Sequence, residues 1–125
     1  MPSSPITCHI LDSSIGKPAP GVGVSLQVRQ ASATPETWRS LAKGVTNAHG
    51  RCNNLLSSDE VAPDVKLEAG GLYKIVFETK DYFDKAGKTT FYPWVEIPFT
   101  VTHPDEHYHI PLLISPFSYT TYRGS

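Results

Sequence analysis

Apolar and polar residues alternate along most of this chain in short runs. In residues 22–29, every second position is Val or Leu and the positions between them are small or polar, which is the period-two pattern of a strand with one buried face. Seven further runs lie between turn residues. The expected strands cover residues 6–11, 22–29, 38–45, 51–55, 72–77, 94–101, 108–114 and 119–123. Eight short strands with frequent turns predict an all-β sandwich.

One segment departs from this pattern and predicts a short helix. The helix is expected to begin with Thr79 as its cap and to end at Gly87. Pro98 lacks an amide hydrogen, so its strand, 94–101, is expected at the edge of a sheet. Residues 57–71 are expected to be mostly loop.

The length and charge of the chain narrow its class. It has 125 residues and no internal repeat or linker, so the whole chain, 1–125, is expected to form a single domain. A formal net charge of −1 gives no electrostatic basis for binding nucleic acid or an anionic membrane. Cys8 and Cys52 match no metal or redox motif. Both are therefore expected as free, partly buried thiols in a reducing compartment.

Targeting signals bear on the compartment. The first five residues lack the basic and hydrophobic regions of a secretory signal. The last three residues are not the peroxisomal Ser-Lys-Leu. The sequence therefore favours a cytoplasmic protein, with the peroxisome as the alternative.

Histidine is the residue type that most readily exchanges protons near neutral pH, because its ordinary pKa is about 6.5. His49 and His103 lie in predicted turns and are expected to be solvated. His9, His107 and His109 lie in or at the start of predicted strands. In each of these strands the opposite face is apolar enough for the core, so the histidines are expected to point away from it.

Two interpretations of these histidines remain open from the residues alone. Each could be an ordinary hydrogen-bonded side chain, or they could carry chemistry. The His-x-His spacing of His107 and His109, with His9 nearby, also permits a zinc site, although no fourth ligand follows at a recognisable spacing. The chain has no nucleophile elbow, no Gly-rich phosphate loop and no paired carboxylates on strands.

The end of the chain is unusually ordered in character. Residues 119–123 are rich in Tyr and Thr, which favour strands, and chain ends usually fray. A tyrosine, an arginine and a terminal carboxylate would then share a sheet edge, which suggests a site. Arg51 follows a turn at Gly50 and alone carries little weight.

Taken together, several segments resemble those of the 5-hydroxyisourate hydrolases, transthyretin-related enzymes of purine catabolism. The closing Tyr-Arg-Gly-Ser is the hallmark of that family, and the match runs in order from Ile6 to Ser125. The segments are Cys8-His9-Ile10-Leu11-Asp12, Gly16-Lys17-Pro18-Ala19, Gly50-Arg51-Cys52, Phe91-Tyr92-Pro93, His107-Tyr108-His109-Ile110-Pro111-Leu112-Leu113 and Tyr122-Arg123-Gly124-Ser125.

The resemblance implies a transthyretin-like sandwich of two four-stranded sheets with a short helix after the fifth strand. It also implies a homotetramer, a dimer of dimers around a central channel, with active sites at the channel mouths. The implied reaction is the hydrolytic opening of the six-membered ring of 5-hydroxyisourate, which gives 2-oxo-4-hydroxy-4-carboxy-5-ureidoimidazoline. No cofactor or metal is implied.

The resemblance also assigns residues. His9 and His109 match the catalytic histidines, one accepting a proton from water and the other orienting water or substrate, in either order. Arg51 matches the arginine that holds substrate oxygens and stabilises transition-state charge. Tyr122 matches the substrate-contacting tyrosine. The further residues that complete or support the site are His107, Arg123, Gly124 and Ser125. The carboxylate of Ser125 could contact substrate or fix a histidine tautomer.

Two other classes of protein are alternatives. A transthyretin-type carrier of aromatic hormone-like ligands would share the fold, but it replaces the two channel histidines with lysine and threonine and lacks Tyr-Arg-Gly-Ser. A structural interaction module would explain the fold and leave the polar residues without a purpose. The sequence favours the enzyme.

Overall fold

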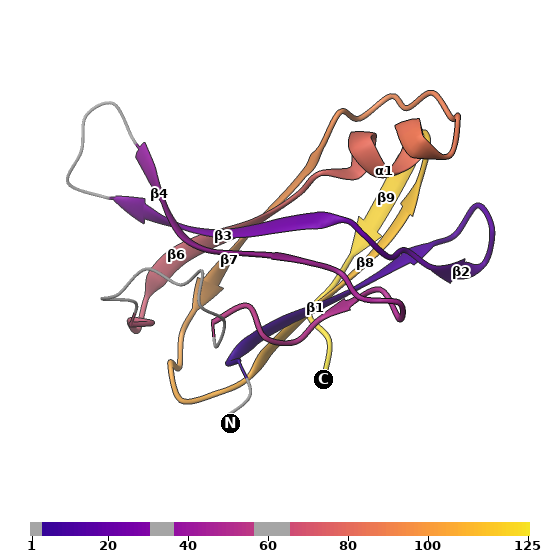
Figure 1. The fold of residues 1–125 in the computed structure, drawn as a ribbon. Helices are drawn as coiled ribbons and strands as arrows, with labels where there is room; N and C mark the ends of the chain where they lie inside the picture. Colours follow the sequence, from indigo (N-terminus) through magenta and orange to yellow (C-terminus); the bar gives the residue numbers. More distant parts are fainter. Residues whose placement is uncertain (1–3, 31–36, 57–65) are drawn as a thin grey trace.

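The computed structural model describes residues 4–30, 37–56 and 66–125, which form two facing β-sheets with a short helix at one end (Figure 1). The elements in chain order are β1 (Ile6–Asp12), β2 (Lys17–Pro18), β3 (Gly23–Gln30), β4 (Thr37–Val45), β5 (Arg51–Cys52), β6 (Gly71–Phe77), α1 (Thr79–Lys85), β7 (Val95–Val101), β8 (Tyr108–Ser115) and β9 (Ser118–Thr121). The predicted β-sandwich is confirmed. No helix among these residues is long and apolar enough to cross a membrane.

The pairing of β1 with β8 determines where the site lies. One sheet has the order β2-β1-β8-β9, with β5 also paired to β1, and the other has the order β4-β3-β6-β7. β1 and β8 run parallel from Ile6↔Tyr108 to Asp12↔Ile114, whereas β5 pairs antiparallel with β1. Segments about a hundred residues apart in the sequence therefore lie side by side. Pro98 lies in β7, an edge strand, as predicted.

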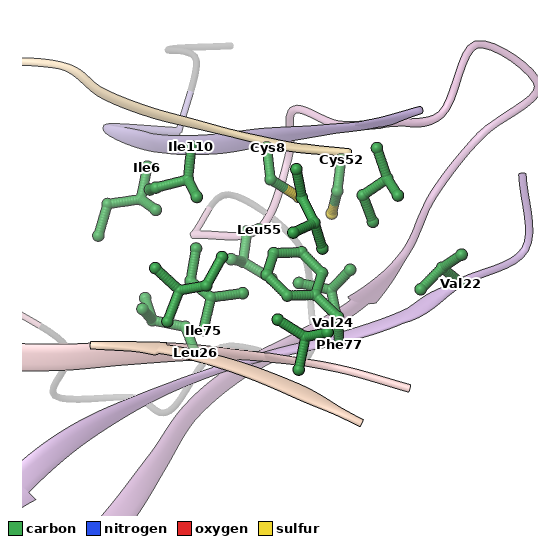
Figure 2. Close-up of a cluster of buried hydrophobic side chains, with 14 of the residues drawn as sticks. Ile6, Cys8, Val22, Val24, Leu26, Cys52, Leu55, Ile75, Phe77 and Ile110 are labelled. Carbon is green, nitrogen blue, oxygen red and sulfur yellow. The ribbon is translucent and has the colours of Figure 1, made fainter. Parts of the chain in front are cut away.

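The hydrophobic core lies between the sheets and explains why these strands form. Ile6, Cys8 and Ile10 alternate along β1 and are fully buried. Figure 2 shows Ile6 and Cys8 facing apolar side chains such as Leu26 and Phe77 of the other sheet. Burying a side chain of this size stabilises the fold by about 1.5–3 kcal/mol. Because successive side chains on a strand point to opposite faces, the residues between them are left for the outer face of the sheet.

Cys8 and Cys52 lie opposite each other across the β1–β5 pair and point into this core (Figure 2). Both are free thiols, as predicted, but both are fully rather than partly buried.

Two local predictions are wrong. The family pattern implied four strands in each sheet, but the short β2 adds a fifth to the first sheet by pairing with Leu11 and Asp12. Lys17 and Pro18 are exposed, so they leave no hydrophobic alternation in the sequence. Thr79 is the first helical residue and not the cap: the cap is Glu78, whose side chain makes no capping hydrogen bond.

Two boundaries also differ. The fourth expected strand ends at Cys52, and the last strand ends at Thr121, so Tyr122 and Arg123 lie beyond it. Gly124 returns to the sheet as an isolated bridge with His109. The helix ends at Lys85 ahead of Gly87, as expected. Of the loop predicted at 57–71, residues 57–65 lie outside the described residues.

Candidate active site

His9 and Arg51 face each other because β5 pairs with β1. They are Cα partners in that ladder, on the sheet face that points away from the core. A tight turn fixes the arginine, because the Asn47 side-chain oxygen accepts the backbone N–H of Arg51 at 3.1 Å. Gly50 has a positive φ of 73°, and its carbonyl accepts the Ile10 N–H at 2.7 Å. An added Cβ would collide with the Ile10 carbonyl, so the turn requires glycine.

His109 joins this face from β8. It is the Cα partner of Thr7 in the parallel β1–β8 ladder. Its ring nitrogen Nδ1 lies 2.8 Å from the Thr7 Oγ1. On its other side, the Gly124 N–H donates to the His109 carbonyl at 2.8 Å. A Cβ at position 124 would lie only 2.8 Å from the His109 Cδ2 and 3.0 Å from the Pro111 Cγ, so glycine is what lets the ring lie there.

Arg51 and His109 line a hollow of about 360 Å³ on the outer face of the first sheet. Its lining comes from β1, β5, the start of β8 and the chain terminus, although these segments are far apart in sequence. The lining residues are Thr7, Arg51, Asn53, His107, His109 and Ser125. The structure thus brings together Arg51, His109, His107 and Ser125, all four predicted from the sequence, with His9 as the Cα partner of Arg51.

Tyr122 lies elsewhere in the single chain. It is exposed and lines a second hollow of about 260 Å³, together with Arg123 and His109. His109 is therefore the residue common to both hollows. Among the described residues, Arg51 is not part of the lining of this second hollow, and Tyr122 is not part of the lining of the first.

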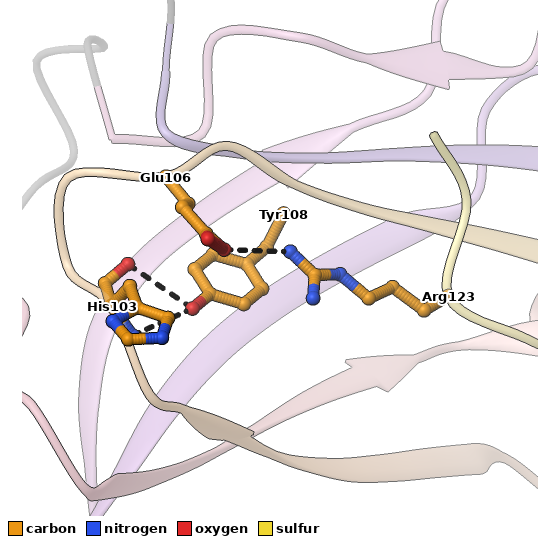
Figure 3. Close-up of polar contacts among 4 residues, drawn as sticks. All are labelled: His103, Glu106, Tyr108 and Arg123. Carbon is orange, nitrogen blue, oxygen red and sulfur yellow. Dashed lines mark hydrogen bonds and ion pairs between the residues drawn. The ribbon is translucent and has the colours of Figure 1, made fainter.

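Arg123 is part of the local scaffold. Its guanidinium donates to the Glu106 carboxylate at 3.2 Å and lies 4.6 Å from the centroid of the Tyr108 ring. The Tyr108 hydroxyl in turn accepts the His103 N–H and donates to the His103 carbonyl (Figure 3). These contacts tie the chain terminus to the loop before β8, which supports the position of Gly124.

His9 and His109, on the outer face of the first sheet, both favour the neutral form of the imidazole. Burial lowers the pKa of His109 first, and the positive Arg51 nearby lowers it further, with smaller effects from His107 and His9. Burial also lowers the pKa of His9, followed by Arg51, while a hydrogen bond to the His49 backbone acts in the opposite direction. A neutral imidazole near neutral pH can accept a proton.

Thr7 is a site residue that sequence reasoning missed. The residue is 5% exposed, and its hydroxyl lies between two rings, 2.8 Å from Nδ1 of His109 and 3.0 Å from Nε2 of His107. The available signal was the alternation that places Thr7 on the same strand face as His9. The Ser125 carboxylate was expected to fix a histidine tautomer, but at His109 the nitrogen Nδ1 is bonded by Thr7 instead.

No metal-binding arrangement is present among residues 4–30, 37–56 and 66–125. Within these ranges, no three His, Cys, Asp or Glu side chains gather in positions that could hold an ion. Within these ranges, the three histidines are therefore not arranged as a set of zinc ligands.

The fold and this site define a β-sandwich protein with a polar hollow lined by imidazole and guanidinium groups. The sequence matches the HIUase/Transthyretin family over residues 6–124, and the chain belongs to that family. A mouse 5-hydroxyisourate hydrolase is 42% identical over 123 residues, covering 98% of this chain and 97% of the relative. A Salmonella typhi protein of the same name is 38% identical, with 98% and 82% covered.

Solved structures of two kinds share the fold. Sea bream transthyretin in complex with thyroxine superposes with a TM-score of 0.80 at 34% identity, covering 97% of this chain and 95% of that one. A Klebsiella pneumoniae 5-hydroxyisourate hydrolase superposes with a TM-score of 0.72 at 35% identity, with 96% and 98% covered. The backbone is thus similar to both, and the side chains of the site must separate them.

Proposed function

We propose that this protein is a 5-hydroxyisourate hydrolase, a cyclic amidohydrolase of urate degradation that produces 2-oxo-4-hydroxy-4-carboxy-5-ureidoimidazoline. The observation that carries the proposal is the gathering of His9, Arg51 and His109 on one sheet face by the pairing of β1 with β5 and β8. Near full-length relatives at 42% and 44% identity carry the name 5-hydroxyisourate hydrolase or its probable form.

In the proposed mechanism, an imidazole takes a proton from the attacking water. We assign this role to His109, because Thr7 occupies its Nδ1 and leaves Nε2 for water. His9 then orients water or substrate. Arg51 binds the carbonyl oxygen and stabilises the negative charge that grows there in the tetrahedral transition state. The lowered pKa values of both histidines keep them ready to accept protons at neutral pH.

We further propose that the protein acts as a homotetramer, a dimer of dimers. Large apolar side chains lie exposed on the single chain, among them Phe91 at 69%, Phe117 at 68% and Tyr122 at 59%. Exposed apolar groups of this size mark contact surfaces between proteins. Tyr122 would then contact substrate in the site of a neighbouring subunit. A light-scattering mass of four times the 13.7-kDa chain is expected, and a monomeric mass contradicts this assembly.

A carrier of aromatic ligands is the second candidate, and the likeness to transthyretin bound to thyroxine favours it. The residues distinguish the two functions, since a carrier needs no proton acceptor beside a guanidinium. Calorimetric titration with thyroxine tests the carrier directly.

The decisive experiment generates 5-hydroxyisourate from urate with urate oxidase and follows its ultraviolet decay. The protein should accelerate that decay, and a rate equal to the spontaneous one refutes the proposal. His9→Ala and His109→Ala should each reduce kcat by about 10²–10⁴-fold. The matched control is His103→Ala, which removes an exposed imidazole from the loop before β8. Unchanged activity after exhaustive chelation would separately exclude a required metal.

The C-terminal tetrapeptide provides a further test. Removal of residues 122–125 should abolish hydrolysis, because it removes Tyr122, Gly124 and Ser125 together. The fold should remain, since the core lies in the earlier strands. Full activity of the truncated chain would show that the terminus is only a sheet edge.

A further inference from the structure

The Thr7 hydroxyl lies between two imidazole rings that belong to one short segment. Thr7 Oγ1 is 3.0 Å from Nε2 of His107 and 2.8 Å from Nδ1 of His109. The two rings are nearly parallel, with an interplanar angle of 24° and centroids 6.4 Å apart. A hydroxyl has one proton, so it can donate to only one of the two nitrogens and must accept from the other.

We propose that Thr7 is a positioning residue that couples the tautomers of His107 and His109, so that His107 decides whether His109 offers a bare Nε2 to water. This inference rests on the proposed function in one respect, the assignment of His109 as the base.

Two arrangements of hydrogen bonds satisfy the geometry. In the first, Nδ1–H of His109 donates to Thr7 and the Thr7 hydroxyl donates to Nε2 of His107, which leaves a lone pair on Nε2 of His109. In the second, both hydrogen bonds reverse, and Nε2 of His109 carries the hydrogen. Only the first arrangement can accept a proton from water. A protonated His107 enforces the second, because its Nε2–H can only donate.

The same contacts provide a balanced path for the proton. His109 takes a proton from water at Nε2 and becomes an imidazolium. It passes its Nδ1 proton to the Thr7 oxygen while the Thr7 hydroxyl proton moves to Nε2 of His107, so that the positive charge ends on His107. When His109 gives its Nε2 proton to the leaving nitrogen, the relay runs backwards. All three side chains then return to their starting forms.

The surroundings favour this arrangement. Thr7 is fixed by the register of the β1–β8 ladder, in which it is the Cα partner of His109. The charged and titratable groups around His109 come from several elements: His9 on β1, Arg51 on β5, and the Ser125 carboxylate in the same hollow. The nearby positive Arg51 disfavours charge on His109, and a path that passes the charge on from His109 is therefore favourable.

Substitution at Thr7 isolates the hydroxyl. Thr7→Val keeps the branched shape and removes the hydroxyl, whereas Thr7→Ser keeps the hydroxyl as the matched control. Imidazole ¹⁵N NMR of the assembled full-length protein reports which ring nitrogen carries a proton, with assignments from His107→Gln. Kinetics on 5-hydroxyisourate report the consequence for turnover.

In the wild type, His109 should carry its proton on Nδ1, and it should switch to Nε2 in the same pH step in which His107 gains a proton. In Thr7→Val that shared step should disappear, and kcat should fall by about ten- to a hundredfold with KM little changed, as a part of the 10²–10⁴-fold gain from general-base catalysis. Thr7→Ser should restore both. The coupling would be overturned if the wild-type His109 signals do not change in the pH step in which His107 gains a proton. It would also be overturned if the shared step survives in Thr7→Val.

The two proposals fail separately. If the wild type shows the shared NMR step but does not accelerate the decay of 5-hydroxyisourate, the coupling stands and the proposed function falls. If hydrolysis is fast and the shared step is missing, the coupling falls and the function stands.

Discussion

Gly124→Ala tests whether the C-terminal glycine is present to admit the His109 ring. The added methyl would lie 2.8 Å from Cδ2 of His109, and 3.0 and 3.2 Å from Cγ and Cδ of Pro111. Ordinary contacts begin near 3.4 Å, so the ring or the terminus must move by about 0.6 Å. The proline is part of the β8 backbone and yields little. The ring is also held by Thr7 at 2.8 Å, so displacing it distorts that hydrogen bond.

The magnitude follows from this displacement. Overpacking of this kind costs about 1–3 kcal/mol, and loss of the Gly124 hydrogen bond to the His109 carbonyl costs about 0.5–1.5 kcal/mol if the terminus moves instead. A misplacement of about 1 Å at a catalytic group can cost about 10²-fold in rate. A shift of about 0.6 Å should therefore reduce kcat by roughly ten- to a hundredfold.

The assay combines kcat on 5-hydroxyisourate with urea denaturation. The control is Gly23→Ala, whose methyl would meet only the flexible side chain of Glu78 at 3.3 and 3.5 Å, outside the site. Gly124→Ala should lose far more activity than the control. Activity within twofold of the wild type, with the wild-type fold retained, would refute the argument that the ring requires glycine at this position.

Three further predictions follow from the same geometry. Because Arg51 lowers the pKa of His109, Arg51→Gln should move the acid limb of the kcat/KM profile to higher pH, while Arg51→Lys should leave it in place; a limb that moves to lower pH contradicts the electrostatic argument. Gly87→Ala should lose about 1–2 kcal/mol of stability for its positive φ alone, since it has open space around it. Gly50→Ala should lose about 1–3 kcal/mol more in urea denaturation, because its methyl clashes with the β1 backbone. Equal losses of stability in the two variants would show that the clash at Gly50 costs nothing. The folded pKa values of His9 and His109 lie below the unfolded value near 6.5, so the unfolded chain binds more protons below about pH 6.5. The free energy of unfolding should therefore fall as pH drops below that value, with no effect above it. His109→Gln should make this fall less steep at fixed protein concentration, and a slope identical to that of the wild type would contradict the linkage.

The sequence was sufficient to predict the two-layer sandwich and to predict which side chains of β1 point into the core and which point out. Period-two alternation placed Ile6, Cys8 and Ile10 in the core and His9 on the opposite face, as the structure confirms. Alternation is reliable here because a strand shifted by one residue would expose its whole apolar set. The edge position of Pro98 followed from its missing N–H in the same way.

Features that depend on pairing between distant segments could not be predicted from local sequence patterns. Thr7 was overlooked because only the parallel register of β1 and β8 places His109 beside its hydroxyl. The short β2 has no buried residue to signal it. Glu78 occupies the N-cap position, and its N–H donates to the carbonyl of Gly23 at the start of β3. Each of these features depends on a contact with another segment that the local sequence does not encode.

The likeness of one fold to both a thyroxine-bound transthyretin and a hydrolase has a physical explanation in the first sheet. The inward face of β1 and β8 packs in the core, and the outward face carries residues of the hollow, because alternate residues of the same strands form the two faces. Cys8 and Ile110, the neighbours of His9 and His109 along these strands, are buried in the core on the opposite face. A family can therefore change its outward-facing side chains, and with them its function, without changing its core. The function of a member then depends on a few outward-facing side chains and on the glycine that makes room for one of them.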